Sequence, residues 1–308
     1  MPPTTDLTPE ELLRRLAAAT PEVVVPAPAP GPGNWVGGPS VVVDGPDVWL
    51  AYRLRAPEGA GRGLANVLAQ STDGGLTFAK VARVSSAEFG AASLERPALV
   101  KRPDGGWRLY VSCSTVGSKH WWVEALDADT VADLPQGTRT VVLPGDDEEG
   151  WKDVVVQVID GRWLMWACRH PLDGGDDEAD RMSTWFATSD DGLAWTLAGP
   201  ALEATAGAWD QRGARVTEVL RTPDGWLALY DGRASAAENF FERTGVAAGA
   251  GPGELRAVAG PVPAAYGVAL RYACVVSTPD GLRAYYETGT PDGSHQLVTA
   301  LLSGVTGR

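Results

Sequence analysis

The chain has 308 residues, of which 44% are hydrophobic and 21% charged, a balance typical of a globular protein with a sizeable core and not of a disordered chain. The 26 Lys and Arg against 39 Asp and Glu give a formal net charge of -13, which argues against nonspecific binding to nucleic acid or to anionic lipid. No apolar run reaches the roughly 18 residues of a membrane span, and Met1-Pro2-Pro3 does not begin a signal-peptide pattern. We therefore expect a cytoplasmic protein with no nucleic-acid or membrane partner.

The first elements are a short helix and an extended spacer. Thr8-Pro9-Glu10-Glu11 combines a capping box with Pro at the first helical position, and Leu12, Leu13 and Leu16 follow at helical spacing. We expect an amphipathic helix over residues 8–19. Residues 26–33 alternate Pro with Ala or Gly, which excludes a helix there.

From residue 35 onward the helical pattern ends and a repeat begins. An apolar run, a turn containing Asp-Gly and an aromatic-rich or apolar strand recur five times. The turns lie at Asp44-Gly45, Asp104-Gly105, Asp160-Gly161, Asp224-Gly225 and Asp280-Gly281, at spacings of 60, 56, 64 and 56 residues. A period of this length with several strands per unit is typical of a β-propeller. The expected fold class is all-β, a five-bladed β-propeller with a short N-terminal helix.

The last repeat begins near Leu270 and has room for three strands before Arg308. Residues 22–25, with the sequence Glu-Val-Val-Val, could supply its outer strand, which would close the ring between the two ends of the chain and remove an exposed sheet edge. The expected organisation is one domain over residues 1–308, with the blades in 35–308.

Two units contain a further turn motif, at residues 71–78 and 188–195. Both match the Asp box, Ser/Thr-x-Asp-x-Gly-x-x-aromatic, in which an Asp side chain organises a hairpin and Gly takes a left-handed conformation. We interpret both as structural.

Five periods, Asp-Gly turns, Asp boxes and 12 Trp residues resemble the five-bladed propellers of carbohydrate-active enzymes over roughly residues 35–305. That group includes glycoside hydrolase family 43, the invertases and levansucrases, and the mannoside phosphorylases. The Asp boxes and Glu95-Arg96-Pro97 are also similar to sialidases, but those propellers have six blades. The resemblance implies an active site at the mouth of the propeller axis.

Aligning the five units on the aromatic strand predicts a ring of cations around that axis. The aligned residues are Gly38, Arg96, Lys152, Arg215 and Arg271, and small residues lie two places further on, where strands would converge. Crowded cations need a compensating anion. This anion is either a ligand carboxylate, phosphate or sulfate, or neighbouring carboxylates such as Glu95, Asp153, Asp210 and Glu218. We assign Arg96, Lys152, Arg215 and Arg271 to substrate binding, together with Glu95, Arg169 and Tyr272.

The same alignment counts against standard glycoside hydrolysis. The resemblance implies a base Asp in the first blade, a helper Asp in the second and an acid Glu in the third. The matching positions here hold Gly38, Arg96 or Ala98, and Lys152 or Val154. Hydrolysis needs two suitably spaced carboxylates, so those catalytic roles are not transferred.

Other candidates lie at the ends of second strands, which run back to the same mouth. They include Arg53 and Arg55, and four possible proton-transfer groups: Asp153, His170, Asp231 and Glu287. Each of these four groups could instead have a structural role: His170 could serve only as a hydrogen-bonding group, and the carboxylates could pair with the cation ring. Trp35 and Trp151 would either stack on a sugar ring or pack between blades.

We expect no cofactor and no metal. The acidic runs 146–149 and 173–180 lack a calcium-loop pattern, and neither a phosphate-binding loop nor Cys/His metal spacing is present. The three Cys residues are read as reduced, buried thiols. The leading hypothesis is a glycoside hydrolase-like enzyme for a small anionic sugar-like substrate, acting by hydrolysis, phosphorolysis or elimination. The alternatives are a non-catalytic propeller that binds an anionic small molecule, and a scaffold for protein partners.

Overall fold

A computed structural model of the chain describes residues 4–174, 180–263 and 270–303. Its one α-helix in those ranges, α1 (Pro9–Ala18), begins after Thr8, whose hydroxyl accepts a hydrogen bond from the Glu11 backbone N–H. Leu12 and Leu16 are buried and pack, with the rest of α1, near β17 (Arg243–Gly249) and β18 (Arg256–Ala259). No helix in the described ranges is long and apolar enough to cross a membrane.

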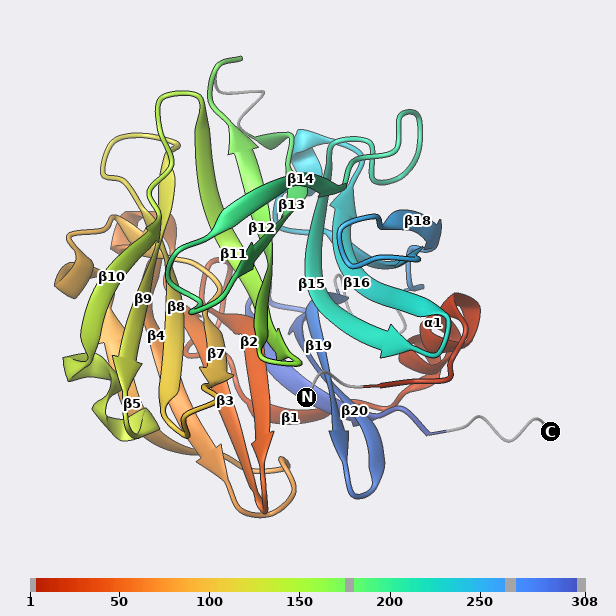
Figure 1. The fold of residues 1–308 in the computed structure, drawn as a ribbon, viewed down its shortest axis with the longest axis horizontal. Coiled ribbons are helices and arrows are strands. Elements are labelled where there is room, and N and C mark those ends of the chain that lie inside the picture. The colour runs from red at the N-terminus through yellow and green to blue at the C-terminus, as the bar shows by residue number, and fades with distance from the viewer. Residues whose placement is uncertain (1–3, 175–179, 264–269, 304–308) are drawn as a thin grey trace.

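The rest of the described chain is almost entirely antiparallel β-sheet, arranged in consecutive groups (Figure 1). The first group contains β2 (Trp35–Asp44), β3 (Asp47–Arg55), β4 (Gly63–Ser71) and β5 (Ala79–Ser85). The second contains β6 (Ser93–Leu94), β7 (Ala98–Lys101), β8 (Trp107–Ser114), β9 (Trp121–Ala128) and β10 (Thr138–Leu143). Paired neighbours follow the chain order in both groups, and the connections range from the two-residue turn between β2 and β3 to the nine-residue segment between β9 and β10.

The later groups repeat this plan. The third contains β11 (Glu149–Ile159), β12 (Arg162–Pro171), β13 (Ser183–Ser189) and β14 (Thr196–Leu202). The fourth contains β15 (Gly213–Thr222), β16 (Gly225–Arg233), β17 and β18, and the last contains β19 (Leu270–Thr278), β20 (Gly281–Gly289) and β21 (His295–Leu301).

A strand from the N-terminal region completes the last group. Strand β1 (Glu22–Val25) lies antiparallel to β21, with Glu22 opposite Thr299. A single parallel bridge between Trp35 and His295 links the last group to the first. Segments from both ends of the chain therefore lie side by side in one sheet.

The first strands of the groups surround a common axis. Strand β2 contacts β7, β7 contacts β11, β11 contacts β15, β15 contacts β19, and β19 contacts β2 again. The interfaces between groups are apolar: Trp151 and Trp163, for example, pack in one cluster, and Trp166 packs in the next. This arrangement directs one end of every first strand to the same mouth of the axis.

A bulge in the first strands changes the register that the sequence alignment predicted. The pairing with the second strand shifts between Gly37 and Ser40, between Lys152 and Val155, and between Arg271 and Cys274. The shifted segments contain residues with left-handed backbone: Gly38 (φ 58°), Asp153 (φ 52°) and Tyr272 (φ 53°). These three residues are therefore equivalent to one another.

The residues just before the bulge form the ring that the structure shows, which differs from the predicted ring. In chain order these ring residues are Gly37, Glu95, Lys152, Arg215 and Arg271. Their partners on the second strands are, in the same order, Arg53, Ser112, Cys168, Asp231 and Glu287. Cations thus occupy three equivalent positions and not four, and Arg96 lies one residue too far along. The error arose because Trp49 comes one residue later on its strand than Trp163 does, and because the second hairpin encloses a longer turn.

Candidate functional site

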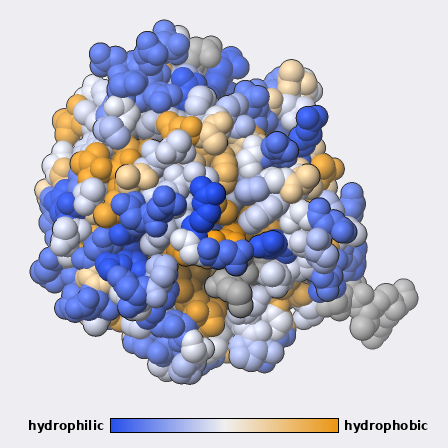
Figure 2. Space-filling view, viewed as in Figure 1, coloured by the Kyte–Doolittle hydropathy of each residue, from blue (hydrophilic) through white to orange (hydrophobic). Residues whose placement is uncertain are grey.

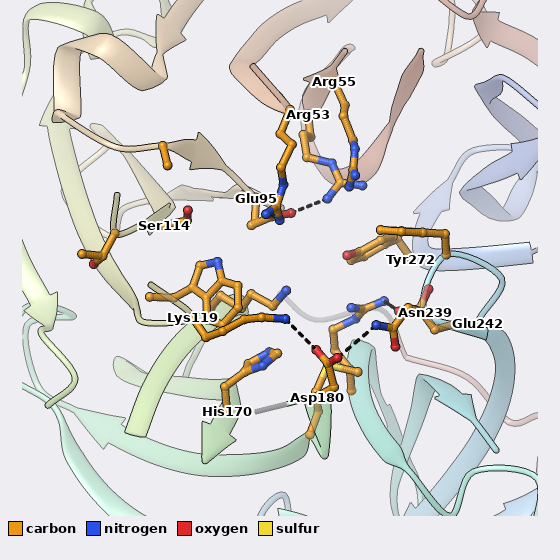
Figure 3. Close-up of a pocket in the computed structure, with 18 of the residues that line it drawn as sticks. Arg53, Arg55, Glu95, Ser114, Lys119, His170, Asp180, Asn239, Glu242 and Tyr272 are labelled. Carbon is orange, nitrogen blue, oxygen red and sulfur yellow. Dashed lines mark hydrogen bonds and ion pairs between the residues drawn. The ribbon is translucent and has the colours of Figure 1, made fainter. Parts of the chain in front are cut away.

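A pocket of about 490 Å³ opens at the mouth where these ring residues gather (Figure 3). Four of the five ring residues line it: Glu95, Lys152, Arg215 and Arg271. Its walls hold three carboxylates, Glu95, Asp180 and Glu242, and eight cations: Arg53, Arg55, Arg62, Lys119, Lys152, Arg215, Arg233 and Arg271. Hydrophilic side chains cover much of the face of the molecule seen in Figure 2, with hydrophobic residues scattered among them.

Two buried carboxylates bind the arginines of the later groups. Glu242 lies 2.8 Å from Arg271, 3.1 Å from Arg233 and 3.4 Å from Arg215. Asp231 lies 2.9 Å from Arg215. Burial alone would raise the pKa of Glu242, but the surrounding arginines outweigh it and hold that pKa below its ordinary value.

A second pair of carboxylates binds the arginines on the opposite side of the pocket. Arg53 pairs with Glu95 and lies 3.5 Å from Glu287, which also accepts a hydrogen bond from His295 Nδ1 at 2.7 Å. Burial would raise the pKa of Glu95 and of Glu287, but Lys152 and Arg53 for the first, and Arg271 and His295 for the second, hold both well below their usual range. Both side chains are therefore fixed as carboxylate anions at neutral pH.

Arg55 differs from the other pocket cations. It is two residues after Arg53 on β3, so both side chains leave the strand on the same face and enter the pocket (Figure 3). Its guanidinium packs on the rings of Trp35, at 4.3 Å, and Phe240, at 4.8 Å. Burial, followed by the repulsion of Arg53, lowers its pKa to about 10.

Tyr272 lies on the pocket wall between arginines. The guanidinium carbons of Arg215, Arg271 and Arg53 lie 4.0, 4.9 and 5.4 Å from the centre of its ring. Its hydroxyl donates to Asp153 Oδ2 at 3.4 Å. Both Tyr272 and Asp153 have left-handed backbone, a conformation that is unfavourable for residues other than Gly and that clusters at functional sites.

The structure separates the four predicted proton-transfer groups into two sets. His170 lines the pocket, with its ring 4.6 Å from that of Trp121, and Asp153 reaches the site through Tyr272. Asp231 and Glu287 are fully buried behind the arginines and do not line the pocket. Burial raises the pKa of Asp231 even though Arg215 opposes that shift.

Arg96 does not belong to this pocket, which corrects its predicted role. Its guanidinium donates to the carbonyl oxygens of Pro39, Val154 and Thr217, which come from three different first strands. It thus closes the axial channel below the pocket, and it lines a different cavity at the other end of the axis. A buried guanidinium satisfied by carbonyl groups serves the packing of the strands.

Three further candidates lie outside the pocket walls. Trp151 is buried in the core and packs against Trp185, and Arg169 pairs with Glu149 at 2.6 Å. Trp35 stacks on His295 at 4.4 Å and reaches the site only by supporting Arg55. The interpretation of these Trp residues as packing groups is the one that their positions favour.

Several pocket residues were not assigned from the sequence. Glu242 and Phe240 lie in the connection between β16 and β17, where no strand periodicity sets the direction of a side chain. Arg53 and Arg55 were candidates because they alternate at the end of a second strand expected to reach the mouth, but they were given no role. In the described ranges, no group of three or more His, Cys, Asp or Glu side chains is placed to hold a metal ion.

Comparisons with known proteins place the fold. No family model matches the sequence, and no curated protein matches it significantly. A solved structure from the GH130 family of mannoside phosphorylases, described as containing glycoside hydrolases that target β-1,2 mannosidic linkages in Candida mannan, superposes with a TM-score of 0.65 at 15% identity, covering 91% of this chain and 93% of that one. The GH43_1 enzyme from Xanthomonas citri complexed with xylose gives 0.64 at 13% identity, with coverages of 96% and 93%.

A thermostable family-43 glycoside hydrolase gives a TM-score of 0.63 at 13% identity, covering 86% of this chain and 88% of that one. At these identities the likeness concerns the fold and not the activity. The structural neighbours of this chain are glycoside hydrolase-like propellers, as the sequence resemblance implied.

Proposed function

We propose that the pocket binds a small anionic, sugar-like molecule and that the chain is a carbohydrate-active enzyme of the glycoside hydrolase-like type. The observation that carries this proposal is the charge of the pocket, where eight cationic side chains face three carboxylates in a chain of net charge -13. The volume of the pocket falls in the range usual for small-molecule sites.

The proposal includes a five-bladed propeller that forms one domain. The closed series of contacts among β2, β7, β11, β15 and β19 supports five blades. The pairing of β1 with β21 and the packing of α1 on the fourth group support a single domain. The compartment proposed is the cytoplasm, with which the three free, buried thiols are compatible.

For the chemistry, we assign proton transfer to Tyr272 with Asp153, and to His170. Of the three pocket carboxylates, Glu95 and Glu242 are held ionised by the surrounding cations, so neither of these two can act as the general acid of a standard hydrolysis. The Tyr272 hydroxyl already donates to Asp153, so this carboxylate can accept the phenol proton when the Tyr272 oxygen acts on the ligand. Asp231 and Glu287, buried behind the arginines, are assigned to positioning them.

A non-catalytic binding propeller is the second candidate. It is favoured by the ion pairing of Glu95, Glu242 and Asp180, because each pocket carboxylate already has a cation within 4 Å. Such a site can recognise an anion without supplying a carboxylate for chemistry.

Turnover separates the two candidates. Wild type, Tyr272→Phe and His170→Gln would be assayed on p-nitrophenyl glycosides, on glucuronides and on the same glycosides with added phosphate. Asp147→Asn, an exposed acidic residue, is the matched control. If the chain is an enzyme, we expect turnover that Tyr272→Phe reduces by at least tenfold and that Asp147→Asn leaves unchanged. Thermal stabilisation by sugar anions without any turnover supports the binding propeller. If neither turnover nor thermal stabilisation is found, both candidates are refuted.

A further inference from the structure

Arg55 is held rigidly where its hydrogen-bonding edge can meet a ligand. Its side chain is 8% exposed and packs on Trp35 and Phe240. Trp35 is itself fixed, because its ring stacks on His295 and its Nε1 donates to the Gly293 carbonyl at 3.2 Å. A guanidinium ordered by aromatic contacts loses little entropy when it binds a planar anion.

Arg55 is also the pocket cation that has no counter-ion within the described part of the chain. Every other cation that lines the pocket has a carboxylate within 4 Å, the partners being Glu95 for Arg53 and Arg62, Asp180 for Lys119, Asp153 for Lys152, Asp153, Asp231 and Glu242 for Arg215, and Glu242 for Arg233 and Arg271. Among the residues that the structure describes, Arg55 has no ion pair, and its buried Nε has no hydrogen-bond partner.

The neighbours of Arg55 make this isolation costly. Burial lowers the pKa of Arg55 most, and repulsion by Arg53, Arg62 and Arg271 lowers that pKa further. Glu95 attracts it, but that carboxylate is already bound by Arg53 and Arg62. A buried charge that the protein does not compensate is unfavourable unless a ligand supplies the opposite charge.

The number and shape of the free donors indicate the class of anion. A guanidinium presents parallel N–H groups that match a planar carboxylate in a bidentate pair. A phosphate monoester carries up to two charges and needs several donors, whereas the other cations here already bind carboxylates. Building on the proposed function, we infer that Arg55 binds the carboxylate of a sugar acid, so that the ligand class is uronate-like and not a sugar phosphate.

The test is calorimetric titration of the full chain with D-glucuronate and D-galacturonate, and with D-glucose, D-glucose 6-phosphate and inorganic phosphate as comparison probes. Arg55→Met removes both the charge and the parallel N–H groups of the guanidinium, whereas Arg55→Lys keeps the positive charge but lacks those parallel N–H groups. Arg221→Met is the matched control, because Arg221 has a half-exposed side chain and does not line the pocket. We expect at least one uronate to bind, about 10- to 100-fold more weakly to both Arg55 variants, and within about threefold to Arg221→Met.

A second measurement needs no variant. Phenylglyoxal modifies accessible, less strongly held arginines, so mass spectrometry of the wild type should find Arg55 modified before Arg215, with the uronate that binds protecting it.

Two results overturn the inference while leaving the proposed function intact: uronate binding that Arg55→Met does not weaken, or tight binding of glucose 6-phosphate or phosphate without any uronate binding. Absence of binding by every anionic probe overturns both.

Discussion

Replacing one buried arginine should stabilise this protein, whereas replacing another in the same pocket should destabilise it strongly. The two changes are Arg55→Met and Arg215→Met, which swap similar volumes at side chains that are 8% and 2% exposed. Their difference lies in counter-ions. Arg215 has three carboxylates, at 2.9, 3.3 and 3.4 Å, and Arg55 has none among the described residues.

The structure gives the sign and size of each effect. Loss of Arg215 leaves Asp153, Asp231 and Glu242 buried without their main cation, a change that costs about 3–5 kcal/mol in comparable sites. For Arg55, the fall in pKa from 12.5 to about 10 corresponds to a burial penalty of roughly 3 kcal/mol. The substitution also removes the cation–π contacts with Trp35 and Phe240, and this loss offsets about 1–2 kcal/mol of the stabilisation gained by removing the buried charge. Arg55→Met should therefore raise the free energy of unfolding by about 1–2 kcal/mol.

The assay is urea denaturation of both variants and wild type without sugar, followed by fluorescence of the Trp residues and by circular dichroism. Equal destabilisation by the two variants would refute the reasoning, since it would show that Arg55 is as well compensated as Arg215. The same experiment with the exposed Arg221→Met sets the scale for a surface arginine, for which a change within about 0.5 kcal/mol is expected.

The other predictions concern packing, pH and the pocket mouth. Gly37→Ala should cost at least about 2 kcal/mol in urea, because its new methyl group would lie 1.8 Å from Glu287 Oε2, whereas Gly59→Ala, with open space around it, should be neutral. Since the pKa of Glu287 is lowered in the folded state, its stabilising effect is complete above its ordinary value of 4.5 and is lost as pH falls below it. The pH dependence of the melting temperature between pH 6 and 3.5 should thus become shallower in Glu287→Gln, and an unchanged slope would contradict this. Phe240→Ala, at a side chain that is 43% exposed, should change the melting temperature little but weaken uronate binding in calorimetry, and unchanged binding would argue that Phe240 does not order Arg55.

The elements of the fold were largely predictable because each rests on local signals. Thr8 and Pro9 mark the start of α1, and the Asp-Gly turns mark the hairpins between first and second strands. The outer-strand segment 22–25 could be placed because an incomplete last repeat leaves an open sheet edge. Each of these inferences would hold even if the predicted strand register were wrong by one residue.

The site depends on the strand register to within one residue, and the sequence was not sufficient to define that register. Alternation sends neighbouring residues to opposite faces, so a one-residue slip put Arg96 in the ring and left Glu95 beside it. The structure reverses them: Glu95 faces the pocket, and Arg96 binds carbonyl groups in the channel. Trp spacing could not reveal the slip, because Trp49 and Trp163 occupy different positions on their strands.

The bulge that caused the slip also explains how the pocket keeps two strained residues. In the first group the equivalent position holds Gly38, which tolerates a left-handed backbone, but Asp153 and Tyr272 do not tolerate it without support. The Asp153 backbone N–H donates to Ser112 Oγ at 2.9 Å, and the Tyr272 backbone N–H donates to Asp231 Oδ2 at the same distance. Since that Asp231 oxygen also binds Arg215, one buried carboxylate fixes both the strained backbone of Tyr272 and the guanidinium stacked on its ring. Asp231 is thus better understood as the support that positions the Tyr272 phenol toward Asp153 than as a group that exchanges protons with a ligand.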